Sequence, residues 1–346
     1  MTCLETQLTD RHMISKVILV AALLSSLPGL VMAQTGGSTN SQRSTGRGLL
    51  YGAAAGGQTL PETSHVEDLT IISSPEIKGH FWTREVHSAR SMRIGTGSPN
   101  LTYHGGKIMP TAVTKAIFWG TSWGSYAGDK ITGLDLWYAG YSNSNYAGTV
   151  TEYTGSNGTV GRVTSHLGHA IDTTVASGGD NSSAILAEVC KLVTNPDASG
   201  NGYYPVYTDI PRGNASYCAW HASGSCGSTV VQFAFFWKLD GDPGCDPQDT
   251  SGLHSQGLAA LANVSGHELS EARTDPSTTS TTGSPGWYDS SGSENGDKCA
   301  WTFGGPLATF SNGSRWKTQG EWSNRAYTAG TGYANASGQK GCLGGL

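Results

Sequence analysis

The stretch His267-Glu268-Leu269-Ser270-Glu271 ends an apolar run, and together they predict a buried helix over about residues 253–273. Residues four apart lie on the same face of a helix, so His267 and Glu271 can bind one metal ion together. Glu268 would lie beside that ion, free to act as a base. The stretch therefore predicts both the central helix of the fold and the first ligands of a metal site.

Segments after this helix supply further carboxylates in a chain that is otherwise poor in charge. The helix pattern is close to the His-Glu-x-x-His motif of zinc enzymes, with a carboxylate in place of the second histidine. A third ligand must come from a returning segment, and Glu294 or Asp297, on a loop beside Cys299, is suitably placed. The histidine favours zinc, with calcium as the alternative. The other interpretation is a turn-rich loop whose carboxylates cap backbone groups.

Several spaced motifs follow one another along the chain: Tyr103-His104-Gly105-Gly106-Lys107-Ile108-Met109, Tyr217-Cys218-Ala219-Trp220-His221, Val264 to Ala272, Thr274-Asp275-Pro276, Gly286-Trp287-Tyr288-Asp289 and Glu294 to Cys299. Over residues 100–346 they resemble the EXORDIUM, or phosphate-induced protein, family, whose bacterial relatives share the His-Glu-x-x-Glu segment. The resemblance implies a secreted protein of the cell-wall space without a settled activity. It also makes His221, in a matched motif, a further candidate ligand. The Ser/Thr-rich residues 277–284 depart from the plant pattern, so no growth-signalling role is carried over.

The N-terminal region divides into two segments that precede the expected domain. Met13-Ile14-Ser15-Lys16 and the apolar run at residues 17–32 predict a secretory signal peptide over residues 1–33. A membrane anchor is disfavoured because Pro28 interrupts a run shorter than the roughly 20 residues that a spanning helix needs. Residues 34–98, rich in Gly, Ser and Thr, predict a flexible or pro-like leader. The globular domain is then expected over residues 99–346, in a secreted protein with no transmembrane segment after cleavage.

Six cysteines remain after the predicted cleavage: Cys190, Cys218, Cys226, Cys245, Cys299 and Cys342. An even number in an oxidising compartment predicts three disulfides. Sequence alone leaves their pairing open. Proximity favours Cys218 with Cys226, which leaves Cys190 with Cys245 and Cys299 with Cys342. A cysteine metal site is disfavoured because the chain has no Cys-x-x-Cys pair.

From about residue 100 the pattern is that of a single α/β domain. Apolar runs predict strands at residues 115–120, 150–153, 160–163, 203–208 and 230–239, and helices at residues 127–138 and 183–193. We expect a mixed β-sheet with a zincin-like active-site helix packed on it, by analogy. A net charge of −5 without any basic run argues against nucleic acid as a partner. The absence of a Gly-x-Ser-x-Gly motif argues against a serine hydrolase.

The sequence thus favours a secreted, disulfide-bonded metallohydrolase of the peptidase type. In this hypothesis His267 and Glu271 bind zinc, and the third ligand is Asp297, Glu294 or His221. Zinc lowers the pKa of its water, and Glu268 takes the proton as that water attacks a carbonyl of a peptide or cell-wall polymer. We expect the protein to be a monomer.

Two alternatives place the same residues in other classes of protein. In a non-catalytic extracellular or cell-wall-associated protein, the cluster would be a structural metal site or a polar staple, and metal removal would lower only stability. In a carbohydrate-active enzyme, Glu268 and Glu294 would act as paired carboxylates. The pair His166-x-x-His169 could chelate on a helix, but the Gly and Thr around it favour a loop.

Overall fold

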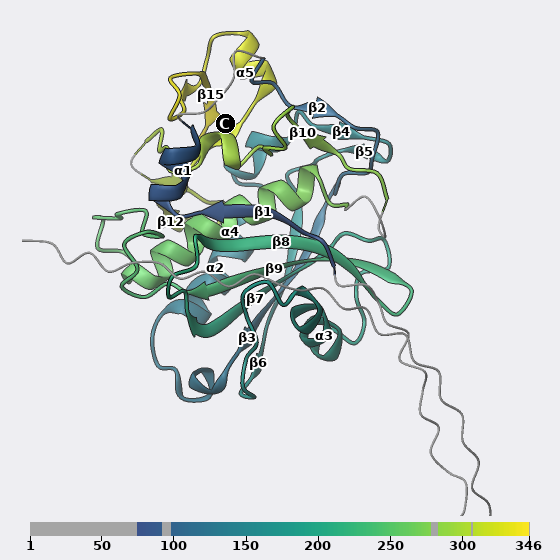
Figure 1. Ribbon diagram of the computed structural model, residues 1–346, viewed down its shortest axis with the longest axis vertical. Helices are drawn as coiled ribbons and strands as arrows, with labels where there is room; N and C mark the ends of the chain where they lie inside the picture. The colour runs from purple at the N-terminus through teal and green to yellow at the C-terminus, as the bar shows by residue number, and fades with distance from the viewer. Residues whose placement is uncertain (1–74, 92–97, 278–282, 306, 346) are drawn as a thin grey trace, which may run out of the picture. The chain divides into compact units, whose positions relative to one another are not determined.

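A six-stranded mixed β-sheet forms the centre of the computed structural model, which describes residues 75–91, 98–277, 283–305 and 307–345 (Figure 1). In spatial order its strands are β1 (Ile77–Trp82), β8 (Tyr217–Cys226), β9 (Thr229–Lys238), β7 (Gly202–Pro211), β3 (Ala112–Trp119) and β6 (Thr164–Asp172). Strands β9, β7, β3 and β6 run parallel, whereas β8 and β1 are each antiparallel to their neighbour. The predicted α/β class with a mixed sheet is confirmed.

The middle strands form where the sequence is apolar on both faces. Residues 231–237 of β9 are all buried, as expected for a strand that is covered on two sides. β8 and β9 form a hairpin through Gly227, whose φ of +60° suits a residue without a side chain. Side chains of β8 alternate between the two faces, so His221 contacts the helix on one side and Gly224 the helix on the other.

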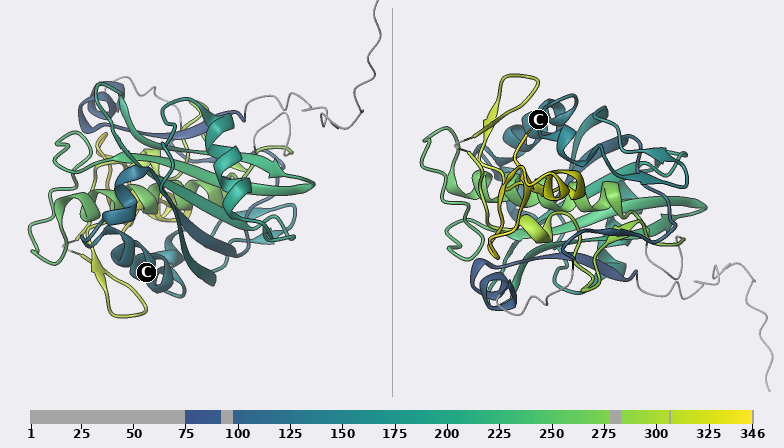
Figure 2. Two further views of the ribbon diagram at one scale, coloured as in Figure 1. Left: turned by 90° about the horizontal axis from the view of Figure 1, so that it is seen from below. Right: turned by 90° about the horizontal axis from the view of Figure 1, so that it is seen from above.

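Three long helices cover the sheet. α2 (Lys130–Tyr141) connects β3 to β6 and packs beside α4 (Gln256–Thr274). α3 (Ser182–Leu192) connects β6 to β7 and packs on β7, β8 and β9. The left view of Figure 2 shows the strands between α3, in teal, and α4, in light green. The helices predicted over residues 127–138 and 183–193 are therefore confirmed with small shifts of their ends.

Helix α4 is buried along its length, from Gly257 to Thr274. Its N-terminus is capped by Ser255, whose side chain accepts a hydrogen bond of 3.2 Å from the backbone nitrogen of Leu258. It ends before Pro276, which has no N–H with which to continue the helix. The helix predicted over residues 253–273 is confirmed. Because both faces are enclosed, any polar side chain on α4 is also enclosed.

Short elements after α4 complete the fold. Three two-stranded sheets pair β10 (Trp287–Tyr288) with β2 (Thr102–Tyr103), β11 (Ala308–Thr309) with β12 (Arg315–Trp316), and β4 (Thr154–Gly155) with β5 (Gly158–Thr159). A three-stranded sheet has β15 (Lys340–Leu343) between β13 (Glu321–Trp322) and β14 (Tyr333–Ala334). Two short helices are α1 (Arg84–Ser91) and α5 (Asn324–Thr328). A disulfide from Cys299 to Cys342 ties the loop at residues 294–297 to β15.

Two of the three predicted disulfides are wrong. The structure pairs Cys190 with Cys226 and Cys218 with Cys245, whereas Cys299 with Cys342 is confirmed. Cys218 and Cys226 are eight residues apart in one extended strand, a separation of roughly 26 Å at ~3.3 Å per residue. A disulfide needs Cα atoms within about 7 Å. Closeness in sequence therefore misled because the segment is a strand and not a turn.

The predicted start of the domain at residue 99 is too late. Residues 77–82, expected within a leader, form the edge strand β1 of the central sheet, and residues 84–91 form α1. β1 includes a glycine and two charged or polar residues, and it gains its stability from pairing with β8, which its own composition does not reveal. The signal peptide predicted over residues 1–33 and the rest of the leader up to residue 74 lie outside the described residues.

The strands predicted at residues 150–153 and 160–163 are also wrong. Residues Ala147–Val150 form a 3-10 helix, and the small hairpin of β4 and β5 lies between the two predicted strands. The apolar residues Val150, Tyr153 and Val160 instead pack in a second, smaller core. Among the described residues, no helix is long and apolar enough to cross a membrane.

Candidate metal centre

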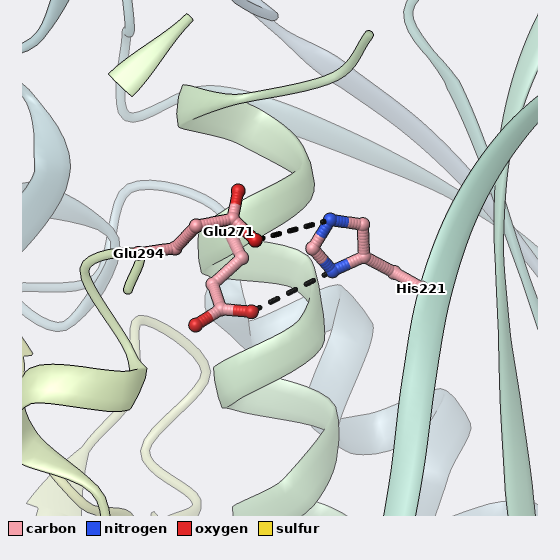
Figure 3. Close-up of side chains that lie close together, drawn as sticks. All are labelled: His221, Glu271 and Glu294. Carbon is pink, nitrogen blue, oxygen red and sulfur yellow. Dashed lines mark ion pairs between the residues drawn. The ribbon is translucent and has the colours of Figure 1, made fainter. Parts of the chain in front are cut away.

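Five buried side chains from three parts of the chain meet at the C-terminal half of α4. They form two groups that could each hold a metal ion: His221 with Glu271 and Glu294, and His267 with Glu268 and Glu271. Figure 3 shows the first group, with His221 reaching from β8 toward the two glutamates. Within each group the potential ligand atoms lie within 4.8 Å of one another. Buried His and Glu groups of this chain can therefore hold a metal ion.

Glu271 links the two groups because its oxygens point in different directions. Its Oε1 lies 3.2 Å from Nε2 of His267, one helical turn earlier on the same face of α4. Its Oε2 lies 3.6 Å from Nδ1 of His221 on the neighbouring strand. The spacing of four residues that suggested a shared ion thus places both side chains at one point.

His221 lies between carboxylates on two sides. Its Nδ1 is 3.2 Å from Oε2 of Glu268, and its Nε2 is 3.7 Å from Oε2 of Glu294. Glu268 belongs to α4, whereas Glu294 comes from the loop that follows β10. The strand, the helix and the loop therefore each supply part of the centre.

Asp297 borders the centre and does not belong to either group. Its Oδ1 lies 3.9 Å from Nε2 of His267, and its side chain is 20% exposed. Its backbone nitrogen donates a 3.0 Å hydrogen bond to Oε1 of Glu271, and its Oδ2 accepts one of 3.1 Å from the backbone nitrogen of Glu294. Asp297 thus fixes the position of the loop that carries Glu294.

Each of the five side chains presents a buried polar atom that has no hydrogen-bond partner among the described residues. These atoms are His221 Nε2, His267 Nε2, Glu268 Oε1, Glu271 Oε2 and Glu294 Oε1. A buried polar atom without a hydrogen bond costs about 1–3 kcal/mol, so native structures keep only a few per hundred residues. The described part of this chain has 19 such atoms, and five of them converge here. Because these five are carboxylate oxygens and imidazole nitrogens, they suit a shared positively charged ligand.

Burial shifts the acid–base equilibria of the cluster toward neutral forms. It lowers the pKa of His267 to about 4 and holds the pKa of His221 well below its usual value. It raises the pKa of Glu268 and Glu294 well above the usual range, and that of Asp297 to about 7. A bound cation would reverse this tendency for the carboxylates, since it stabilises their ionised form.

Gln319 and Gly296 both lie against the ring of His267. The amide nitrogen of Gln319 lies 3.0 Å from Nδ1 of His267 and donates a 2.9 Å hydrogen bond to the carbonyl of Gly296. Because the carbonyl of Gly296 can only accept, the amide nitrogen of Gln319 must face it, and the same nitrogen then faces Nδ1 of His267. Gln319 therefore fixes the plane of the His267 ring.

Sequence patterns missed the residues that β1 contributes. The ammonium group of Lys78 forms an ion pair with Asp275 and lies 3.9 Å from Oε1 of Glu294. Gly79 adjoins His221 and Glu271 so closely that an added Cβ would lie 2.2 Å and 2.4 Å from their atoms. Both residues lie in the part of the chain that resembled a leader, 178 and 177 residues before the first residue of α4, and no local pattern marks them.

Comparison with known proteins adds no assignment. No family model, no curated protein and no solved structure matches this chain. The chemistry of the site therefore follows from its own residues. Imidazole and carboxylate together suit zinc and other first-row divalent metals better than they suit calcium, which prefers oxygen ligands alone.

Proposed function

We propose that this protein is a secreted zinc-dependent hydrolase of the peptidase type, with Glu268 as the general base. The observation that carries the proposal is the convergence of five buried atoms that make no hydrogen bond within the described residues, on His221, His267, Glu268, Glu271 and Glu294. The three disulfides fit an oxidising, extracellular location. The resemblance to the EXORDIUM family remains part of the proposal and rests on the sequence motifs alone.

Spacing within the cluster suits a small metal ion. Ligands bound to zinc at about 2.0–2.2 Å in a tetrahedron lie roughly 3.3–3.6 Å from one another. Glu271 lies at 3.2 Å from His267 and at 3.6 Å from His221, measured between the facing atoms. His267 and Glu271 would hold the ion in one group, which also contains Glu268, whereas His221 and Glu294 form the other group, at the second oxygen of Glu271.

The residues around the ion have separable tasks. A bound zinc ion would act as a Lewis acid that polarises a carbonyl and lowers the pKa of water. Glu268 would hold and pass on a proton, since its Oε1 makes no hydrogen bond with described residues while His221 holds its Oε2. Lys78 would offset the charge of Glu294. Asp297 would keep the loop in register through its hydrogen bond to Glu271.

A structural metal site in a non-catalytic protein is the second candidate. It is favoured by one specific observation: the side chains of His267, Glu268 and Glu271 are fully buried, and those of His221 and Glu294 are 2% exposed. Structural zinc sites are closed, whereas catalytic sites keep a position open for water or substrate. The two candidates agree on metal binding and differ in whether the cluster can be reached.

The first experiment measures metal content by elemental mass spectrometry on the secreted protein. We expect about one equivalent of zinc in the wild type and a loss of it in His267→Ala. His166→Ala, which removes a histidine that is hydrogen-bonded to Asp135 on another part of the sheet, is the matched control and should keep its metal. Absence of zinc from the wild type would refute the proposal, and calcium in its place would support a structural site.

A further inference from the structure

Strand β1 covers the metal centre. It is the edge strand of the sheet, antiparallel to β8, with Lys78 paired to His221 and Phe81 paired to Ala219. Three steps along β1 therefore match two along β8, so the strand bulges at Gly79 and His80, directly over the cluster. Figure 1 shows β1 lying alongside β8 and close to α4. The main chain of β1 thus runs past the histidine and glutamates of the centre.

Contacts between β1 and the centre are close and specific. At Gly79, φ is +52° and a Cβ would collide with His221 and Glu271, so the bare backbone fills this space. The ring of Phe81 is fully buried and lies with its centroid 4.4 Å from that of His267 and 4.6 Å from that of Trp301. One residue of the strand thus meets the ligands through its backbone, and a second, two positions later, fills an aromatic pocket.

The same contacts close the centre to other molecules. A cavity of about 700 Å³ borders β1 and the loop, and its wall includes Glu294 and Asp297. His221, His267, Glu268 and Glu271 are not among the described residues that line it. A hydrolase needs its base and its metal ligands within reach of a substrate, so one wall of the centre must move if the proposed function holds.

Two segments of the chain form the walls of the centre next to the cavity: β1 and the loop at residues 294–297. Only β1 lacks a disulfide to the rest of the fold. The loop at residues 294–297 is tied to β15 by the disulfide from Cys299 to Cys342. Residues 75–91 contain no cysteine, and α1, which follows β1, has no buried residue. A single cut of the chain after α1 would leave β1 held by noncovalent contacts alone. β1 is therefore the wall that can be displaced.

We propose that the edge of β8 beside the centre is a binding site for an extended polypeptide, and that β1 occupies this site in the uncut chain. The inference rests on the proposed hydrolase function and names its substrate class. Addition of a strand to a sheet edge supplies main-chain hydrogen bonds, and side-chain pockets then give selectivity. Because β1 occupies the site, its sequence predicts which polypeptides the site prefers. We expect a glycine or similarly small residue beside the metal ligands, followed two residues later by an aromatic side chain.

The test inserts a recognition sequence for a site-specific protease immediately before Ser98, which is exposed. Zinc-loaded protein is assayed before and after the cut for hydrolysis of fluorescein-labelled casein. Binding of a labelled peptide with the sequence of residues 77–82 is measured by fluorescence anisotropy. We expect the uncut chain to be at least tenfold less active than the cut chain. Excess unlabelled peptide should inhibit the cut chain, and a peptide with alanine in place of Phe81 should inhibit at least tenfold less.

A matched pair of substitutions tests the occupant without any cut. Gly79→Ala places a Cβ against His221 and Glu271, whereas Gly213→Ala meets nothing within 4 Å. The two glycines have similar positive φ values, +52° and +57°, so the backbone strain is alike in both variants. We expect Gly79→Ala to raise the activity of the uncut chain severalfold and Gly213→Ala to leave it unchanged, with zinc content measured in both.

The outcomes separate the two proposals. Uncut, zinc-loaded protein that already hydrolyses casein as fast as cut protein would overturn the role of β1 and leave the hydrolase in place. Cut protein that binds the peptide but hydrolyses nothing would keep the binding site and overturn the hydrolase. Cut protein that fails to bind the peptide would overturn the binding site.

Discussion

Two clusters of histidines and carboxylates lie on one sheet and differ in how their polar atoms are satisfied. On β6, His166 and His169 both contact Asp135 of α2, at 2.9 Å and 2.6 Å. The second nitrogen of His166 lies 2.9 Å from the hydroxyl of Thr114. These histidines were expected in a loop, and that expectation is wrong, because both lie on a strand parallel to β3. The side chains of His166, His169, Asp135 and Thr114, called the β6 cluster below, thus hydrogen-bond to one another.

The metal centre is built from the same kinds of residue, histidines and carboxylates, but in it the carboxylates outnumber the histidines. Its side chains are buried, and each of the five leaves one polar atom without a hydrogen bond within the described structure. Residue type therefore does not distinguish a metal site from an ordinary polar cluster. The distinguishing features are an excess of negative groups, burial, and convergent atoms that make no hydrogen bond within the described residues, and each can be tested against the β6 cluster.

The largest expected contrast is in catalysis. Glu268→Gln removes the base but keeps the size of the side chain, so the hydrolysis rate of cut, zinc-loaded protein should fall by about 10²–10⁴-fold. Zinc content should stay near that of the wild type. Asp135→Asn, the equivalent change in the β6 cluster, should leave the rate within about twofold. The rate is measured with labelled casein, and an active Glu268→Gln protein would contradict the assigned base.

Metal removal should lower the thermal stability of the protein only when the metal centre is intact, whatever the state of the β6 cluster. An ion present at about 100 times its Kd stabilises the folded state by about 2.7 kcal/mol. Chelation should therefore lower Tm by roughly 5–10 °C in a domain of this size. The shift, measured by calorimetry, should persist in His166→Ala and vanish in His267→Ala. A chelator shift of equal size in both variants would mean that the ion binds elsewhere.

The β6 cluster itself should contribute modestly. Asp135→Asn weakens its two charge-assisted hydrogen bonds at a partly exposed site, and we expect a loss of roughly 1 kcal/mol in the free energy of unfolding. Urea denaturation measures the loss. A loss above about 3 kcal/mol would show that the cluster is more tightly coupled to the core than its exposure indicates.

The smallest expected effect is a change of stability with pH that arises from Asp172, a carboxylate at the end of β6 that is paired with Lys191. The hydrogen bond from Lys191 is the main cause of a lowered pKa for Asp172. Its folded pKa is below its unfolded value, so its stabilising contribution is complete above the unfolded pKa of about 3.9 and is lost as pH falls toward the folded value. The stability difference between wild type and Asp172→Asn should therefore shrink between pH 5 and pH 2.5, as measured with urea. A difference that grows over this range would contradict the assignment.

Sequence patterns predicted the parts of the molecule whose signals are local. Apolar runs predicted the middle strands and the three long helices, and the four-residue spacing of His267 and Glu271 placed both on one face. Glu294 was predicted from the need for a returning segment. His221 was identified through a matched motif, since nothing in its own neighbourhood shows that β8 lies against α4.

The parts that the sequence did not predict depend on tertiary pairing. Residues 77–82, Ile-Lys-Gly-His-Phe-Trp, have no regular alternation of polar and apolar types and so lack a strand signal, yet they pair with a strand 140 residues away. Lys78 and Gly79 reach the centre only through that pairing. The disulfide of Cys190 joins α3 to the end of β8, and that of Cys218 joins the start of β8 to the loop after β9. Spacing along the chain does not show that these parts meet in space.

The bridge from Cys299 to Cys342 has a consequence for when the ion enters. Glu294 can join the ligands on α4 and β8 only when its loop lies against α4, and this bridge secures the loop there. A chain in which the bridge is still reduced would thus hold Glu294 less firmly. The metal supply of the compartment that oxidises the protein, more than intrinsic affinity, would then decide which ion it carries.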